Sequence, residues 1–271
     1  MAMFETLDEA LLHLDNPTPY RHAISVLLAK LDDPDADSKG VADILVNDSV
    51  LSASIMKIAN SAYYGMSGRV RSLPSAISVL GFMTIRSLGI AALLNSSATS
   101  NNLDIDHLVL AGLSTAIALE SDEDIPAATA TCVGLLADIG RIMLRNKSIK
   151  TYEDALVALS QREDVEDYEL SLIEIEKEIF GFDHCEIGSH LLKSWNFPDD
   201  ICQAVKNHGY TSSKVALERT IQRAVRLLPE YKSAIAIEAL EEKDAEADLD
   251  ETQKLFLETK EFIDEYLAAT R

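Results

Sequence analysis

Asp138, His184 and His208 carry side chains of the kind that hold divalent metal ions in hydrolytic sites. Three protein ligands are enough for one catalytic zinc ion, so this set could in principle hold a single metal that activates water. Asp138 also has a structural interpretation, because it stands among apolar residues, where a carboxylate is costly unless it is paired. We therefore expect Asp138 to bond a histidine or a backbone N–H of a neighbouring helix.

The two histidines also suit structural roles, which we favour. Leu191 and Trp195 follow His184 at helical spacing, so His184 faces the core side of its helix. His208 directly precedes Gly209, a position typical of a helix C-terminus, where the helix dipole favours a protonated imidazole.

Asn60, Arg69 and Arg71 form a second group of candidate residues. Asn60 falls where a helix ends, and we expect it to bond free backbone carbonyls or a facing loop. Arg69 and Arg71 could recognise a phosphate or a carboxylate of a partner, although loop arginines are more often solvated or paired locally. The sequence has no Gly-x-Ser-x-Gly elbow, P-loop, Gly-x-Gly-x-x-Gly or zinc-finger spacing.

The composition limits the partners of the chain. A net charge of -21 over 271 residues disfavours nucleic acid and anionic membrane surfaces, and it suits proteins that present basic patches. Three cysteines without a Cys-x-x-Cys pair indicate reduced thiols in a cytoplasmic protein. We find no secretory signal and no run of eighteen apolar residues. The stretch between Asp48 and Asp104 lacks carboxylates, and we expect most of it to be buried.

Helical periodicity dominates the chain, and glycine and proline number only 11 and 7. No alternating strand pattern or tandem repeat occurs, so the fold class is all-α. We expect helices near 20–31, 41–46, from Asp48 to about Gly65, 72–80, 82–94, 105–120, 126–146, 152–162, 166–179, 184–195 and 199–208.

Two further segments organise the chain. Residues 95–102 are rich in serine and asparagine and form the best internal boundary. In the tail, the acidic run 238–251 indicates a solvated helix face or a loop, and the apolar residues after Leu255 indicate a docking helix.

Several motifs together resemble the HDOD family, the HD-related output domain. They are Ala-Asn-Ser-Ala at 59–62, Ala-Ile-x-x-Leu-Gly at 76–81, Gly-Leu-Leu-Ala-Asp-Ile-Gly at 134–140, and His-x-x-x-Gly-x-x-Leu-Leu-x-x-Trp-x-x-Pro at 184–198. The resemblance covers residues 17–212. It implies a helical lobe (17–98) packed on an HD-domain-like helical bundle (103–212), followed by a C-terminal helical extension (213–271). It also implies a bacterial, cytoplasmic regulatory protein.

The same resemblance places the ligand positions of an HD phosphohydrolase at Leu113, Ala137, Asp138, His184 and His208. Leu113 and Ala137 stand where metal-binding histidines are expected, and a hydrocarbon side chain cannot coordinate a cation. We therefore expect a degenerate active site without catalytic residues, metal or cofactor.

The function we expect is a non-catalytic signal-transduction module that binds other signalling proteins; the sequence does not indicate the oligomeric state. Two alternatives remain open. One is a residual single-metal phosphohydrolase that uses Asp138, His184 and His208. The other is a small-molecule sensor whose ligand occupies the vacated metal pocket.

Overall fold

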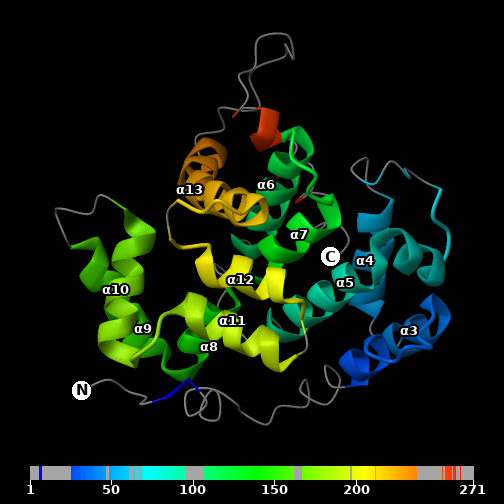
Figure 1. Cartoon of the computed structure of the whole chain (residues 1–271), viewed down its shortest axis with the longest axis horizontal. Helices are drawn as coiled ribbons and strands as arrows, with labels where there is room; N and C mark the ends of the chain where they lie inside the picture. The colour runs from blue at the N-terminus through cyan, green and yellow to red at the C-terminus, as the bar shows by residue number, and fades with distance from the viewer. Residues whose placement is uncertain are drawn as a thin grey trace. The chain divides into compact units, whose positions relative to one another are not determined.

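A computed structural model describes the chain at residues 6–7, 26–46, 49–60, 64, 66, 69–95, 106–161, 167–195, 197–210, 212–236, 252, 254–257, 259–260 and 263. These residues form helices joined by turns and loops, and no strand occurs among them (Figure 1). The predicted all-α class is confirmed. Of the predicted boundary at residues 95–102 only Asn95, the last residue of α5, is described, and the acidic run 238–251 lies outside the described residues.

The chain divides into two compact units, each of which is described by itself. The first unit comprises residues 1–17 and 136–225, and the second unit comprises residues 18–135 and 226–271. The predicted division of the chain into a lobe, a bundle and an extension stays a prediction.

The second unit contains the helices α3 (Ser38–Leu45), α4 (Ser49–Ala59), α5 (Leu73–Asn95), α6 (Asp106–Glu120), most of α7 (Ala127–Leu136) and the end of α13 (Ala216–Ala236). Helices α3 and α4 both pack on α5. Helix α5 is kinked at Gly81, where a break was predicted. The φ of this residue is 78°, a value that residues with a side chain rarely adopt. The glycine thus allows the helix to change direction between its two apolar parts.

Helix α5 lies within the stretch that lacks carboxylates. Its described side chains from Thr84 to Ile90 are all buried, which agrees with the expected burial. Segments 73–90 and 127–145 are long and apolar enough to cross a membrane by length and composition alone, but 56% and 67% of their residues are buried within the structure. Such burial is typical of core helices.

The tail docks through its apolar side chains. Leu255 and Phe256 are buried, and the Phe256 ring meets the Tyr231 ring of α13 edge to face at a centroid distance of 5.3 Å. This part of the predicted docking helix is observed.

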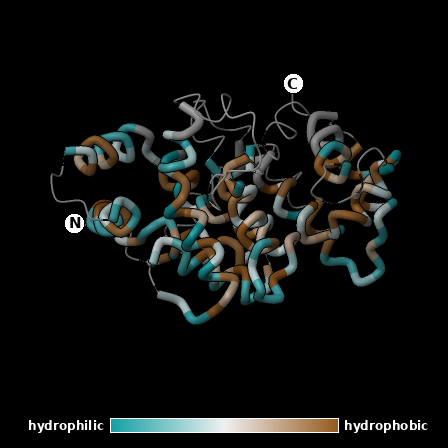
Figure 2. Tube along the Cα trace, turned by 90° about the horizontal axis from the view of Figure 1, so that it is seen from above, coloured by the Kyte–Doolittle hydropathy of each residue, from teal (hydrophilic) through white to brown (hydrophobic). Residues whose placement is uncertain are grey.

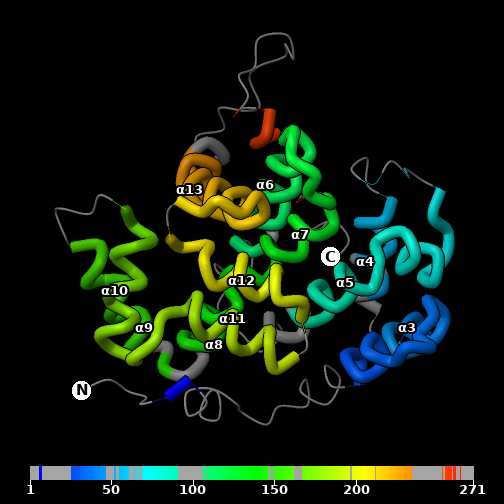
Figure 3. Tube along the Cα trace, in the orientation of Figure 1, coloured from blue at the N-terminus to red at the C-terminus, as the bar shows by residue number. Residues whose placement is uncertain are grey.

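The first unit contains α8 (Ile139–Lys147), α9 (Ile149–Ser160), α10 (Tyr168–Phe180), α11 (His184–Ser194), α12 (Asp199–Asn207) and the start of α13. Helix α11 packs on α8 and α12, and α9 packs on α8 and α10, as the trace in Figure 3 shows. Hydrophobic and hydrophilic residues alternate along the trace in Figure 2, and in the first unit Leu144, Tyr152, Phe180 and Ile187 form one core cluster. Buried apolar faces therefore hold the unit together.

Helices α8 and α11 approach each other at two glycines. A Cβ on Gly140 would fall 2.0 Å from the carbonyl oxygen of His184, and a Cβ on Gly188 would fall 3.1 Å from a methyl carbon of Ile139. Only glycine at position 140 permits this distance between the two backbones. The close approach brings the start of α8 against the start of α11.

One predicted helix is wrong. The expected single helix at 126–146 is two helices, α7 and α8, separated by a turn at Ala137 and Asp138. Asp138 therefore lies at a helix junction rather than in a helix interior, with φ and ψ of −90° and 12°. An apolar periodicity that continues through both helices conceals the break.

Candidate functional site

Asp138, His184 and His208 come together in the first unit, as the metal-binding and the structural interpretations both require. Asp138 precedes α8, His184 is the first residue of α11, and His208 directly follows α12. The Nε2 atoms of the two histidines lie 3.2 Å apart, and His208 Nε2 lies 3.7 Å from Asp138 Oδ1. All three side chains are buried, so the predicted histidine partner of Asp138 is present.

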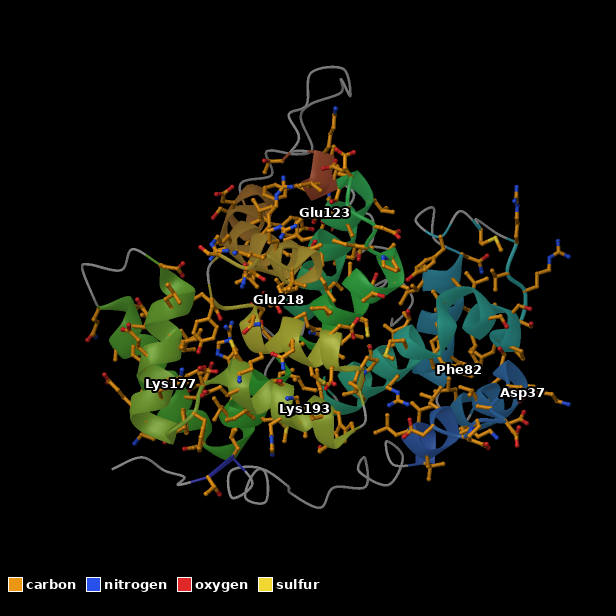
Figure 4. All side chains as sticks on the ribbon, in the orientation of Figure 1. Asp37, Phe82, Glu123, Lys177, Lys193 and Glu218 are labelled. Atoms are coloured by element: carbon orange, nitrogen blue, oxygen red, sulfur yellow. The ribbon has the colours of Figure 1, made fainter. Side chains whose placement is uncertain are left out.

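The start of α11 is fixed by a capping box. Asp183 Oδ1 accepts a hydrogen bond from the Glu186 backbone N–H at 2.7 Å, and Glu186 Oε2 accepts one from the Asp183 backbone N–H at 3.3 Å. Lys177 of α10, labelled in Figure 4, lies 2.9 Å from Asp183 Oδ2, and the Tyr210 hydroxyl donates to the same oxygen at 2.8 Å. These bonds set where the helix begins and so where His184 stands.

The carboxyl group of Glu176 orients His184. Glu176 Oε2 accepts hydrogen bonds from the His184 backbone N–H at 2.9 Å and from its Nδ1 at 2.5 Å. The other oxygen, Oε1, accepts a bond from the Tyr152 hydroxyl at 2.7 Å. Because Nδ1 donates to Glu176, Nε2 is the atom of this ring that points into the cluster.

A backbone carbonyl orients His208 in the same way. His208 Nδ1 donates to the carbonyl oxygen of Val205 at 2.6 Å, which leaves Nε2 to face His184. The thiol of Cys185 lies beside both rings, with Sγ at 3.5 Å from His184 Nε2 and 3.8 Å from His208 Nε2.

Arg141 brings a permanent positive charge into the cluster. Its Nη2 atom lies 2.7 Å from Glu169 Oε1, 3.5 Å from Asp138 Oδ1 and 3.2 Å from His184 Nε2. Glu169 Oε1 also lies 2.8 Å from His184 Nε2. The guanidinium thus neutralises carboxylates that would otherwise be buried without a partner.

The charges in the cluster shift the pKa of its carboxyl groups. Burial alone would raise the pKa of Asp138, but the Arg141 charge and the neighbouring His208 outweigh burial and lower it to about 2. Burial likewise opposes ionisation of Glu169, yet Arg141 and His184 hold its pKa well below its usual range. Both groups are therefore carboxylates at neutral pH.

The pKa values of the histidines and the thiol are shifted together. Burial would lower the pKa of His208, but the neighbouring Cys185 and Asp138 raise it to about 10. Burial also opposes the charge on His184, whose pKa is nevertheless raised, chiefly by Cys185 and Glu176. Burial would raise the pKa of the Cys185 thiol, but the two imidazoles lower it. The site thus favours a thiolate beside imidazolium rings.

Five members of this cluster are not indicated by the sequence. They are Arg141, Tyr152, Glu169, Glu176 and Cys185. One signal was available, because Glu169 and Glu176 are seven residues apart in a predicted helix and so share a face. Their partners come from α8, α9 and α11, and spacing along the sequence does not reveal which helices meet.

The cluster does not fit the two-metal site of an HD phosphohydrolase. Ala137 is fully buried and offers only a methyl group. Leu113 lies fully buried in α6 of the second unit and offers only a hydrocarbon side chain. Two ligands are therefore missing, and we derive no hydrolytic step through such a centre.

Asn60 has the expected backbone partners. Its Nδ2 donates to the carbonyl oxygens of Met56 and Val70, each at 2.9 Å, and its Oδ1 accepts from the Val70 backbone N–H at 2.9 Å. These bonds support the structural alternative for Asn60. Arg69 and Arg71 are exposed on the loop that flanks Val70, and their predicted interaction role stays a prediction.

Comparisons with known proteins give one family and several similar folds. The model of the HDOD domain family matches residues 18–210. A solved protein named as a candidate phosphohydrolase, from Shewanella amazonensis SB2B, gives a TM-score of 0.67 at 21% identity, over 97% of this chain and 98% of that one. A Geobacter sulfurreducens structure, named as an HDOD domain protein with unknown function, gives 0.57 at 21% identity, over 97% and 87%.

Two further relatives are longer than this chain. A candidate signal transduction protein from Marinobacter aquaeolei VT8 gives a TM-score of 0.62 at 21% identity, over 95% of this chain and 59% of that one. An uncharacterized protein of Treponema pallidum (strain Nichols) is 20% identical over 183 residues, which are 66% of this chain. The match covers 34% of that relative, so this chain spans about a third of its length. At these identities the solved structures show a shared HD-like helical fold.

Proposed function

Because the chain belongs to the HDOD domain family, we propose that it is a non-catalytic regulatory module of signal transduction that binds other signalling proteins. The name of the Marinobacter aquaeolei structure supports the signalling role. The net charge of -21 supports a partner with a basic surface, and we place the protein in the cytoplasm.

One observation carries the non-catalytic part of this proposal. Where a hydrolase of this fold needs a metal ion near the aspartate, the guanidinium of Arg141 lies among Asp138, Glu169 and His184. A guanidinium has no empty coordination position and cannot activate water as a metal does. Together with Ala137, it leaves the cluster without the ligands of a two-metal centre.

A hydrolysis assay tests the absence of catalysis. The full chain is incubated with nucleotides, cyclic dinucleotides and a generic phosphodiester in the presence of Mg²⁺, Mn²⁺ or Zn²⁺, beside the matched variant Asp138→Asn. We expect no turnover above that of the variant. Turnover by the wild-type chain that Asp138→Asn abolishes would overturn the proposal.

A second experiment addresses the partner. The chain is used as bait in bacterial lysate at low salt, and bound proteins are eluted with a salt gradient. We expect a signalling protein with a basic surface to elute as salt screens the attraction. Capture of a partner whose binding does not respond to salt would contradict the charge argument.

The residual single-metal phosphohydrolase remains a second candidate, because Asp138, His184 and His208 do lie within one cluster. It predicts turnover that depends on added metal and is lost in His208→Gln. The small-molecule sensor stays an untested prediction, and a ligand-induced rise in melting temperature is its test.

A further inference from the structure

Three donor atoms in the first unit lie at the separations of zinc ligands. The Nε2 atoms of His184 and His208 are 3.2 Å apart, and Cys185 Sγ lies 3.5 Å and 3.8 Å from them. With Zn–N bonds of about 2.05 Å and a Zn–S bond of about 2.3 Å, tetrahedral geometry requires about 3.3 Å between nitrogens and about 3.6 Å from nitrogen to sulfur. One ion therefore fits among the three atoms with only small shifts.

Both histidines also have the outer bonds that metal ligands require. A histidine that binds metal through one nitrogen usually donates its other N–H to a carboxylate or a backbone carbonyl. His184 Nδ1 donates to Glu176 in this way, and His208 Nδ1 donates to Val205. Glu176 is itself held by the Tyr152 hydroxyl. Both Nε2 atoms are thus turned toward the same point.

This orientation calls for a cation at that point. When each Nδ1 carries its hydrogen, the neutral rings present two lone pairs to each other at 3.2 Å, which is repulsive. Either a proton or a metal ion between the rings removes the repulsion. Asp138 and Glu169 adjoin the same space and bring negative charge to it.

The remaining neighbour is Arg141, whose Nη2 lies 3.2 Å from His184 Nε2. The guanidinium competes for the same lone pair and repels a second cation. Arg141 also contacts Glu169 at 2.7 Å and Asp138 at 3.5 Å, so the guanidinium keeps two carboxylate partners when the ion is bound. Arg141 should therefore weaken the site without abolishing it.

We propose that His184, Cys185 and His208 bind one Zn²⁺ ion in a buried site that is distinct in its donors from the two-metal centre of HD hydrolases. Two imidazoles and a thiolate favour Zn²⁺ over Mg²⁺ or Ca²⁺, which prefer oxygen ligands. As the Zn–N and Zn–S bonds form, the protons held on the Nε2 atoms of the imidazolium rings leave to solvent, and the sulfur binds as a thiolate. This proposal departs from the absence of metal expected from the sequence, which gave Cys185 no role.

The ion would link two helices of the first unit. His184 and Cys185 begin α11, whereas His208 directly follows α12. The three bonds therefore connect the start of one helix to the end of another. All three residues are fully or almost fully buried, which suits a structural ion rather than one that admits a substrate. Zinc binding therefore adds to the stability of this unit.

Equilibrium dialysis of the full chain against Zn²⁺, after chelation and removal of the chelator, tests the proposal by elemental analysis. We expect about one equivalent of zinc per chain, lost in Cys185→Ser and retained in Cys202→Ser. Cys202 is a suitable control because it is also buried but bonds the Phe197 carbonyl instead. Less than about a tenth of an equivalent in the wild-type chain would overturn the proposal.

Spectroscopy of the wild-type chain keeps the test decisive if Cys185→Ser fails to fold. Co²⁺ in place of Zn²⁺ should give a thiolate-to-metal charge-transfer band and the intense visible bands of a tetrahedral site. X-ray absorption at the zinc edge should show one sulfur at about 2.3 Å. Zinc that is bound with oxygen and nitrogen ligands alone would refute the role of Cys185.

Two further variants test the neighbours. Glu176→Gln should weaken zinc binding by about 10- to 100-fold, because it loosens the orientation of His184. Arg141→Met should strengthen binding, because it removes the competing cation. An unchanged affinity in both variants would contradict the geometry. Binding and turnover are measured separately, so zinc binding without hydrolysis leaves the proposed function intact.

Discussion

The two units differ in how their buried polar groups are paired. In the second unit, Thr115 and Thr131 join α6 and α7 through a hydroxyl–hydroxyl bond of 2.8 Å, within a mostly apolar interior. In the first unit, Arg141 lies between carboxylates in a site closed to solvent. Neutral hydroxyls can lose a partner at modest cost, whereas a buried charge cannot. The stability of the first unit therefore depends on keeping all of its buried charges paired.

Arg141→Met should have the largest effect on stability. It removes the guanidinium from between the buried carboxylates of Asp138 and Glu169, and we expect the free energy of unfolding to fall by about 3–5 kcal/mol. Urea denaturation measures the loss. The control is Arg86→Met in the second unit, whose partner Asp32 has a side chain 38% exposed and stays hydrated. A loss for Arg86→Met equal to that for Arg141→Met would remove the distinction between the units.

Gly140→Ala should have the next largest effect. The new Cβ would meet the backbone of α11, so α8 and α11 must separate, and we expect a loss of about 3 kcal/mol. Gly89→Ala in α5 is the matched control, because its Cβ meets only the flexible end of Leu27. Thermal unfolding compares the two variants. Equal melting temperatures would show that the contact between α8 and α11 can relax.

Tyr152→Phe removes one hydrogen bond to Glu176 and keeps the ring in the core. The loss of the donor leaves a buried oxygen of Glu176 without this bond, so we expect a loss of about 2 kcal/mol. Chemical denaturation provides the measurement. Stability within error of the wild-type chain would show that the bond between Tyr152 and Glu176 contributes little to folding.

Ser114→Ala should have the smallest effect. Ser114 Oγ is buried in α6 without a hydrogen-bond partner among the described residues, so its loss should change stability by less than about 0.5 kcal/mol or increase it. The same denaturation assay compares it with Tyr152→Phe. A large loss for Ser114→Ala would mean that polar groups in the second unit matter as much as those in the first.

The sequence predicts the helical framework better than the cluster. Helices α11 and α12 match their expected ranges, and His208 follows α12 as expected, because apolar spacing and capping residues are local signals. The break at Asp138 was missed because the apolar pattern continues through it. Arg141 and Cys185 were missed for another reason, since their significance depends on which helices meet in space.

The hydrogen bonds between Glu176 and His184 have a consequence for any ligand of this ring. One carboxylate oxygen accepts from the backbone and from the ring of the same residue, so the side-chain torsions of His184 are set once the chain has folded. The His184 side chain loses its rotational freedom during folding, so this entropy is not lost again when a ligand binds. The imidazole is therefore preorganised, and a ligand of this ring must match its fixed orientation.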